Sequence, residues 1–559
     1  MNRQVELWLR AKGRLRARAF DRAAEDPKQA QAQYLRTLLH QNRDTAFGRE
    51  HGFDSIRNPR DYAARVPVRD YDGLRPWVER LAGGERNVLT RHPPLLFGTT
   101  SGTTGLPKLV PVTRPWAREL RALLGLWLYK SLHDHPRLLS GKSGSLVSPA
   151  VEGAAPDGTP TGSVSGLTYR SAPWIVRRTY AVPYAVSEIA DYDHRYLVAV
   201  RFLFAASVSL LAAPNPSTLL RIASEGETHS ETIVRAVHDG ALGVDATDSC
   251  RNSRSERQLY AALDRAIRPD RARARDLEAA LRRDGKLLPQ TVWPQLAMIG
   301  CWLGGSAGVQ ARRLSASYGD VPVRDLGFRA TEATVTVPHT DGTAAGPLAV
   351  HVGFHEFVPE EQIEDEHPPV LLAHELEEGA RYYILLTTSA GLYRYDINDV
   401  VEVHGFYRRA PELAFVRKGR DMVNLTGEKL HSFQIAQAAE LAAGDVHRPD
   451  VQIQLIPDAN SMRYDLLTEG VSSPELEIFA GAFDRHLATL NIEYDQKRAS
   501  RRLGPPNAIP MNPGWAVRHR QFDVEHGGKR DTQYKWPYFR MEWDERNRSE
   551  IENGESSLR

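Results

Sequence analysis

A loop dense in glycine and hydroxyl side chains is the first segment whose residue types could do chemistry. It runs from Gly98 to Lys108 as GTTSGTTGLPK and follows a short apolar run. Glycines let the backbone approach a polyphosphate closely, hydroxyl and amide groups donate hydrogen bonds, and lysine supplies a point charge. The spacing fits neither G-x-x-x-x-G-K-[ST] nor G-x-G-x-x-G. The loop predicts polyphosphate binding, with the candidate residues Thr100, Ser101, Gly102, Thr103, Thr104 and Lys108.

Three further segments follow the loop in the sequence. They are GGSAG at 304–308, LGFRATE at 326–332 and LYRYDINDVVEV at 392–403. In this order, the four segments resemble the signature motifs of adenylate-forming enzymes, a superfamily that activates carboxylates with ATP. The resemblance implies that Glu332 helps to hold Mg²⁺ and that Asp399 accepts hydrogen bonds from the ribose hydroxyls. It also implies nucleotide contacts from Gly304, Gly305, Ser306, Phe328, Ala330, Thr331 and Arg417.

One branch of that superfamily is similar over most of the chain, from about residue 30 to about 540. The segments 66–85, 354–361, 391–403 and 427–430, and the tetrapeptide TQYK at 532–535, resemble the auxin-responsive acyl acid amido synthetases. The resemblance implies an ATP-dependent ligase that adenylates a small carboxylic acid and passes the acyl group to an amine or amino acid. It also implies that Lys535 swings in to polarise the reacting groups, and a flexible stem with a compact charge suits that task.

Several positions depart from the family pattern. Phe328 stands where a tyrosine is usual, Asn398 replaces the glycine before Asp399, and Trp536 follows Lys535 in an unusual tail. Asn is the non-glycine residue that best tolerates positive φ, so the turn at Asn398 can survive. Ser432 stands where the family often carries an acidic residue.

Other interpretations stay open at this point. Lys108 could tie down its loop, Glu332 could be a carboxylate at a helix start, and Asp399 could be a turn residue. Arg394 could be a structural partner, and Lys535 could be an exposed loop lysine. At the level of the whole protein, the acyl group could pass to coenzyme A or a carrier thiol, or the chain could bind nucleotide for regulation without turnover.

The composition narrows the class of protein. The 559 residues carry a net charge of only +2. A charge this close to zero gives no argument for a nucleic-acid partner or an anionic membrane. Two cysteines fit a reducing compartment, and we expect a cytoplasmic protein that is a monomer or weak oligomer. The 11 Lys against 61 Arg suggest a bacterial member of the family.

The elements that must position these residues predict an α/β fold. We expect a large N-terminal adenylate-forming domain, residues 1–416, with helix-flanked sheets, and a small mobile α+β domain, residues 417–559. Residues 1–90 read as mostly helical, with Leu35, Leu38 and Leu39 on one apolar stripe. The run 296–303 reads as a buried strand and 197–214 as a buried core helix. We expect the acyl pocket among scattered side chains, in part from 120–240.

Overall fold

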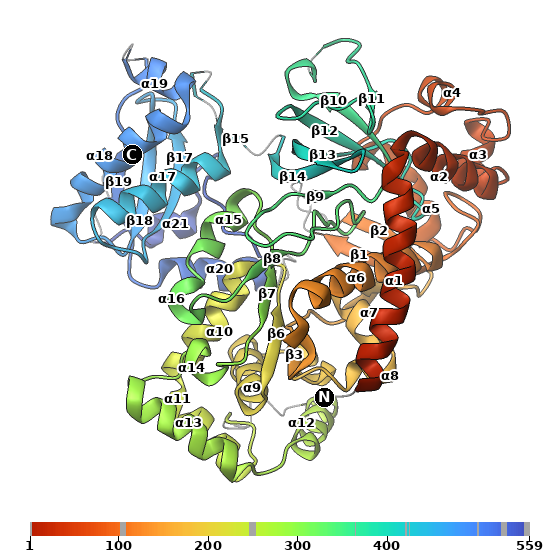
Figure 1. The fold of residues 1–559 in the computed structure, drawn as a ribbon. Coiled ribbons are helices and arrows are strands. Elements are labelled where there is room, and N and C mark those ends of the chain that lie inside the picture. Colours follow the sequence, from red (N-terminus) through yellow and green to blue (C-terminus); the bar gives the residue numbers. More distant parts are fainter. Residues whose placement is uncertain are drawn as a thin grey trace. The chain divides into compact units, whose positions relative to one another are not determined.

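The computed structural model describes residues 3–100, 108–244, 253–363, 365–419, 422–423, 425–426, 428–499, 502–526 and 534–552. The chain divides into two compact units. The larger contains residues 1–304 and 310–415, and the smaller contains residues 416–559 together with 305–309. The predicted α/β class is confirmed, since helices and sheets alternate through both units (Figure 1).

Helices form the start of the larger unit, as the sequence predicted. Side chains cap the first turns of these helices. Asp26 accepts a hydrogen bond from Gln29 N at the start of the second helix, and Asn58 and Asp70 cap the starts of the fourth and fifth helices in the same way. Leu35, Leu38 and Leu39 are buried along one stripe. The helices are α1 (Arg3–Glu25), α2 (Pro27–Asn42), α3 (Ala46–Glu50), α4 (Pro59–Arg65) and α5 (Tyr71–Ala82).

A large sheet packs against these helices. Its strand order is β11-β10-β12-β13-β14-β9, and β10, β12 and β13 pair in antiparallel fashion. Apolar side chains of these strands share a core with α2 and α5. The strands are β9 (Gly346–Pro347), β10 (Phe354–Pro359), β11 (Leu371–Leu372), β12 (Arg381–Thr387), β13 (Tyr395–Tyr407) and β14 (Ala410–Lys418).

A second sheet contains the hairpin that flanks the glycine-rich loop. Its strand order is β2-β1-β5-β4, and the long helix α6 (Arg114–Asp134) follows β2 directly. Thr113 caps α6 by accepting a hydrogen bond from Trp116 N. The strands are β1 (Pro94–Thr100), β2 (Lys108–Thr113), β4 (Gly153–Ala154) and β5 (Pro160–Gly162).

A parallel sheet with the order β3-β6-β7-β8 completes the larger unit. The predicted strand at 296–303 is confirmed as β7. The prediction of one core helix over 197–214 is wrong, because α9 ends at Ala205 and β6 begins at Val208. Apolar length alone cannot separate a buried helix from a helix followed by a strand. The strands are β3 (Lys142–Gly144), β6 (Val208–Ala212), β7 (Met298–Cys301) and β8 (Val323–Asp325).

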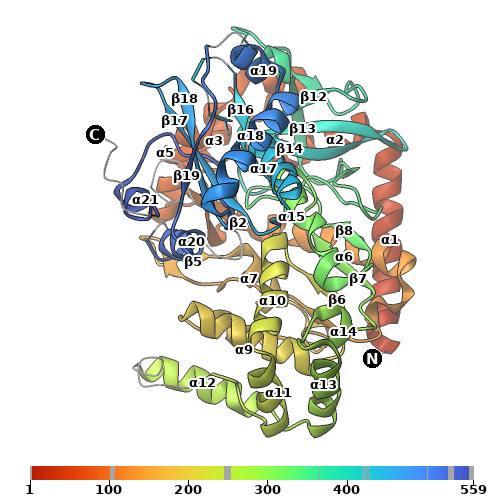
Figure 2. The same ribbon diagram turned by 90° about the vertical axis from the view of Figure 1, so that its left-hand side faces the viewer.

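Helices surround this parallel sheet and extend to one end of the larger unit (Figures 1 and 2). They are α7 (Val164–Arg170), α8 (Trp174–Arg177), α9 (Tyr192–Ala205), α10 (Pro216–Thr228), α11 (Ser230–Asp239), α12 (Arg254–Ala266), α13 (Arg271–Asp284), α14 (Pro289–Val292) and α16 (Ser315–Tyr318). A further helix, α15 (Gly305–Arg312), is divided between the two units.

The smaller unit has its own core, built where α17 and α18 cover a sheet of order β17-β18-β19. Among the described residues of the whole chain, none of the helices combines the length and apolar character that a membrane crossing requires. The elements are β15 (Met422–Val423), β16 (Leu430–His431), α17 (Ser432–Asp445), β17 (Gln452–Asp458), β18 (Arg463–Glu469), α18 (Ser473–Leu490), α19 (Ile492–Ala499), β19 (Asn507–Pro510), α20 (Trp515–His526) and α21 (Glu545–Ser549).

Candidate active site

The hairpin of β1 and β2 fixes both ends of the glycine-rich loop. Thr99 pairs with Leu109 and Thr100 with Lys108, so the loop leaves and returns at adjacent points. The Leu109 N–H donates to the Tyr71 hydroxyl at 2.7 Å, and Lys108 Nζ lies 5.3 Å from the centre of the Tyr71 ring. Lys108 therefore makes a cation–π contact at the loop's base. The predicted phosphate ligands Ser101, Gly102, Thr103 and Thr104 lie outside the described residues, as does the Thr100 side chain.

Asp325 connects the end of β7 to the segment 326–332. Its two carboxylate oxygens accept hydrogen bonds from Leu303 N at 2.6 Å and from Gly327 N at 2.5 Å. Burial raises the pKa of Asp325 to about 7, while the two backbone donors and the charge of Arg329 act in the opposite direction. One side chain thus sets the relative positions of two predicted nucleotide-binding segments.

The segment 328–334 forms a tight turn that holds Glu332 in a buried position. Ala330 N donates to Ala333 O at 2.8 Å, and the Trp116 indole N–H donates to Glu332 O at 3.0 Å. Glu332 is 7% exposed, and its neighbour Thr331 packs against Gly98 of β1. The turn and β1 are therefore in direct contact.

The charges of Glu332 and Asp399, which are 67 positions apart in the sequence, both affect the pKa of Tyr395. Burial raises the pKa of Tyr395 well above its usual value, and the nearby charges of Glu332, Asp399 and Asp396 raise it further. Glu332 also contributes to the raised pKa of Tyr71, whose main cause is burial. The charges of both predicted ligands thus affect Tyr395, and that of Glu332 also affects Tyr71, whose hydroxyl bonds to the β1–β2 hairpin. The sequence assigned no role to either tyrosine.

The start of β13, which contains Tyr395, also positions Asp399. Asn398 has φ of 59°, a left-handed conformation that asparagine tolerates.

Arg394 is structural here: its guanidinium pairs with Glu356 at 3.0 Å and donates to the carbonyls of Ala63 and Val66 at 2.9 Å. The alternative in which Arg394 is a structural partner is therefore the one that the contacts support.

Two of the predicted adenine-side residues, Gly304 and Phe328, lie next to Phe415. A Cβ on Gly304 would lie 2.7 Å from Phe415 O, and the ring centres of Phe328 and Phe415 are 5.6 Å apart. Gly305 has φ of 55° and begins α15, which also contains Ser306. Phe415 is a residue that the motifs did not single out, although it directly precedes the predicted domain boundary.

Arg417 belongs to the smaller unit and bonds to its own loop. Its guanidinium donates to the carbonyls of Lys418 at 3.1 Å and Gly419 at 3.0 Å. These contacts shape the segment at which the smaller domain was predicted to begin.

Lys535 is exposed, while both of its neighbours are anchored. The Tyr534 hydroxyl donates to Asp523 at 3.3 Å, and the Trp536 indole donates to Ile453 O at 2.6 Å. Trp536, which departs from the family pattern, thus holds the strand-like tail in place. Thr532 and Gln533 of the TQYK motif lie outside the described residues.

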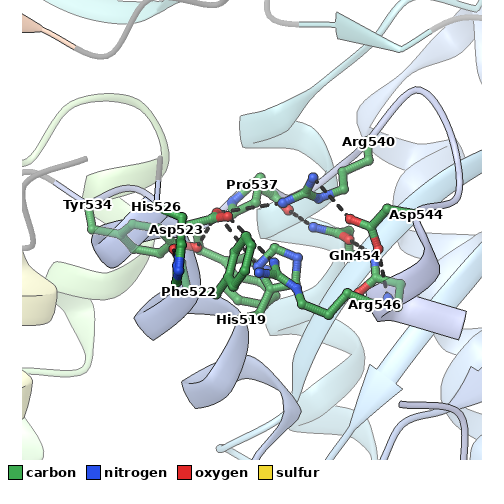
Figure 3. Close-up of polar contacts among 12 residues, drawn as sticks. Gln454, His519, Phe522, Asp523, His526, Tyr534, Pro537, Arg540, Asp544 and Arg546 are labelled. Atoms are coloured by element: carbon green, nitrogen blue, oxygen red, sulfur yellow. Dashed lines mark hydrogen bonds and ion pairs between the residues drawn. The ribbon is translucent and has the colours of Figure 1, made fainter. Parts of the chain in front are cut away.

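Asp523 of α20 is the centre of the polar cluster that holds Tyr534 (Figure 3). Arg540 and Arg546 lie 3.6 Å and 3.5 Å from its carboxylate, and His519 lies at 3.6 Å. Burial, followed by the two guanidinium charges, lowers the pKa of His519 to about 4. A neutral imidazole and two cations therefore surround a single buried carboxylate.

Known proteins resemble the chain over nearly all of its length. The GH3 family N-terminal domain matches residues 16–323, the GH3 family central domain matches 346–418, and the GH3 family C-terminal domain matches 437–541. The chain belongs to the GH3 family. The resemblance to auxin-responsive acyl acid amido synthetases is thus confirmed.

Curated GH3 relatives share about a quarter of their residues with this chain. The probable indole-3-acetic acid-amido synthetase GH3.2 of Oryza sativa subsp. japonica is 25% identical over 544 residues, covering 91% of this chain and 87% of the relative. Jasmonoyl–L-amino acid synthetase JAR6 of Nicotiana attenuata is 23% identical over 447 residues, covering 76% and 75%. Both are plant proteins, so the bacterial origin suggested by the Arg-rich composition is not borne out.

A solved GH3 structure confirms the fold. The AtGH3.15 acyl acid amido synthetase in complex with 2,4-DB covers 96% of both chains with a TM-score of 0.81 at 19% identity. The adenylate-forming fold class with a separate C-terminal domain therefore applies to this chain.

This GH3 chain also contains a small cavity next to Glu332. Its apolar walls come from Trp116, Leu120 and Leu123 of α6 and from Ala333. It is partly open to solvent, and the centre of a water molecule can occupy about 20 Å³ of it. Its polar walls are Glu119, Thr334, His355 and Thr388. No motif pointed to it, because its residues come from separate elements and have no fixed spacing.

Proposed function

We propose that this GH3 protein is an ATP-dependent ligase that adenylates a small carboxylic acid and transfers the acyl group to an amine or amino acid. The products are an amide, AMP and pyrophosphate. The observation that carries the proposal is the direct packing of Thr331, the neighbour of Glu332, on Gly98 of the hairpin that bears the glycine-rich loop. The charges of Glu332 and Asp399 both contribute to the raised pKa of Tyr395, which supports their proximity.

The residues present fit ATP with Mg²⁺. Mg²⁺ binds through one or two carboxylates together with phosphate oxygens, and Glu332 offers a buried carboxylate. Asp399 has two oxygens that can accept hydrogen bonds from ribose hydroxyls. Bound Mg²⁺ would neutralise phosphate charge. The adenine base would contact Gly304, Gly305, Ser306, Phe328, Ala330 and Thr331, and the phosphates would contact the loop from Thr100 to Lys108.

Lys535 carries the catalytic role in this proposal. The carboxylate oxygen of the acid attacks the α-phosphorus, and the ammonium of Lys535 stabilises the negative charge that develops there. Its exposure and its anchored neighbours support this role, because the side chain can extend while its backbone position is fixed. Arg417 contributes through the segment that it shapes, which would act as the hinge between domains 1–416 and 417–559.

The acid would extend from Glu332 into the adjacent cavity, which Ala333 and Thr334 help to line. Trp116 supports this placement because its indole binds the Glu332 carbonyl while its ring lines the cavity. Apart from Leu120 and Leu123, most of the lining comes from outside the range 120–240 that the sequence suggested. We also propose a cytoplasmic monomer or weak oligomer without nucleic-acid or membrane partners, supported by its charge balance.

Acid-dependent exchange of labelled pyrophosphate into ATP tests the adenylation step. Exchange with at least one acid from a broad panel is the expected result, and its absence with every acid would instead favour nucleotide binding without turnover. Adding amino acids or coenzyme A in separate reactions identifies the acceptor. AMP release with amino acids is expected, whereas release with coenzyme A alone would favour the acyl-CoA alternative.

A further inference from the structure

His355 lines the cavity, and its ring is buried with both nitrogen atoms unpaired among the described residues. The residue is 1% exposed, and neither Nδ1 nor Nε2 has a hydrogen-bond partner within the described part of the chain. Its backbone is held firmly, since His355 N donates to Gln31 Oε1 at 2.8 Å. Burial lowers the pKa of the ring to about 3, so at neutral pH it offers one donor and one acceptor. A buried polar group of this kind is destabilising until a partner reaches it.

Glu119 brings a second polar group to the same cavity. Its carboxylate accepts hydrogen bonds from the hydroxyls of Ser389 and Tyr34. Burial raises the pKa of Glu119, and those two donors act in the opposite direction. The carboxylate is therefore fixed in place while it also lines the cavity.

The remaining walls define the size and character of what can enter. Trp116 and Leu123 are apolar, whereas Thr388 adds a hydroxyl-bearing side chain to the same lining. The volume of 20 Å³ suits one group of the size of a water molecule. A methyl group would fit by volume but would leave the imidazole nitrogens without partners.

We propose that this cavity is a subsite for a hydroxyl group on the acid substrate, recognised by His355 and Glu119. A hydroxyl both donates and accepts, which matches a ring with one donor and one acceptor. The substrate class is thus a hydroxylated carboxylic acid with an otherwise apolar skeleton. The inference rests on the proposed function, because it assumes that the acid binds behind Glu332.

Paired acids that differ by one hydroxyl test the subsite. The probes are benzoate with 4-hydroxybenzoate, phenylacetate with 4-hydroxyphenylacetate, and hexanoate with 6-hydroxyhexanoate. We expect kcat/KM in pyrophosphate exchange to favour the hydroxylated acid about tenfold or more in at least one pair, since a site built to bind a hydroxyl rejects the analogue that lacks it. Equal kcat/KM values for the two acids of every pair would overturn the proposal, since the cavity would then bind water and not a substrate hydroxyl.

His355→Phe removes both nitrogens at similar volume, and the preference for the hydroxylated acid should fall to about twofold or less. His355→Gln, which restores an amide donor and acceptor, should recover part of it. His351→Phe is the matched control, because His351 is a neighbouring histidine with a buried Nδ1 that does not line the cavity, and it should keep the wild-type preference. A wild-type preference in His355→Phe would contradict the assignment.

Calorimetric titration of the same acids into the full chain separates this inference from the proposed function. If no acid supports exchange, the proposed function fails, yet the ratio of dissociation constants within each pair still decides the subsite. If exchange occurs but hydroxylated and parent acids bind equally, the subsite alone is wrong.

Discussion

Gly98 of β1 and Thr331 of the turn before Glu332 are packed so closely that a Cβ on Gly98 would lie 2.4 Å from Thr331 Cγ2. Real Cβ atoms do not approach neighbours at that distance, so the contact requires glycine. Gly98 also pairs with Val110 on one side and Gly162 on the other, which leaves its backbone no freedom to move away. The glycine-rich hairpin and the turn that carries Glu332 are therefore positioned by a single contact.

Gly98→Ala should impair nucleotide binding. The added methyl group would push Thr331 away from β1 and shift Glu332 with it, and overpacking of this kind costs about 1–3 kcal/mol. We expect a lower free energy of unfolding in urea and an increase in the dissociation constant for ATP. Gly444→Ala is the control, because nothing lies within 4 Å of a Cβ there and alanine favours the helix α17. A Gly98→Ala protein with wild-type ATP affinity would show that the contact does not position the site.

Lys535→Ala should slow adenylation with little change in ATP affinity. The ammonium acts on charge that develops in the reaction, and loss of one such group typically reduces the rate by roughly 100-fold or more. Pyrophosphate exchange measures the rate, and equilibrium titration measures ATP binding. Lys28→Ala, which changes an exposed lysine of α2, should exchange at the wild-type rate. Wild-type exchange in Lys535→Ala would remove the role assigned to it.

Asp523→Ala should destabilise the smaller unit and also disturb Lys535. Asp523 is 8% exposed and faces Arg540, Arg546 and the Tyr534 hydroxyl, so its removal leaves two guanidinium groups without their shared carboxylate. Arg540 keeps Asp544 at 3.3 Å as a second partner, and Arg540 and Arg546 are 28% and 26% exposed, so we expect a cost of about 1–3 kcal/mol. Urea unfolding measures the loss of stability.

Tyr534→Phe separates the effect on Lys535 from the effect on stability. It removes only the hydroxyl that donates to Asp523 and leaves the carboxylate with both arginines. We expect a modest loss of stability, about 1 kcal/mol, together with a lower kcat for exchange at unchanged ATP affinity. A variant with normal kcat would indicate that this hydrogen bond does not position Lys535.

The sequence predicted the segments of the site better than their connections. The order of motifs around Lys108, Glu332 and Asp399 is legible because glycines, carboxylates and a lysine at fixed spacing carry chemical meaning. The roles of Asp325 and Tyr395 were not legible, because their partners come from distant strands. The cavity at His355 was hidden for the same reason, and the helix-to-strand change near Ala205 was hidden because both elements there are apolar throughout.

Arg394→Met should destabilise the larger unit strongly, because it leaves Glu356, which is 2% exposed, as an unpaired buried carboxylate. The expected loss is about 3–5 kcal/mol. Adding Glu356→Leu to this variant should recover much of the stability, since apolar residues of similar volume replace a buried pair well. The recovery should be incomplete, because the carbonyls of Ala63 and Val66 lose their donor. Additive losses in the double variant would contradict a direct coupling.

Histidine at position 355 should make the protein sensitive to acid. Burial lowers the pKa of His355 to about 3, whereas an unfolded histidine titrates near 6.5, so the unfolded state binds a proton in this interval and the native state does not. The free energy of unfolding is therefore independent of this proton above about pH 6.5 and decreases as the pH falls toward 3. By pH 5 the loss relative to pH 7 should be about 2 kcal/mol.

His355→Phe should remove this part of the pH dependence. The free energy of unfolding of the variant should fall less than that of the wild type between pH 7 and pH 5, and urea unfolding at both pH values measures the difference. His367→Gln is a suitable control, since it replaces an exposed histidine that does not line the cavity. Parallel pH profiles for the wild type and His355→Phe would mean that the imidazole has the same pKa in the native and unfolded states, so that burial does not keep the ring neutral in acid.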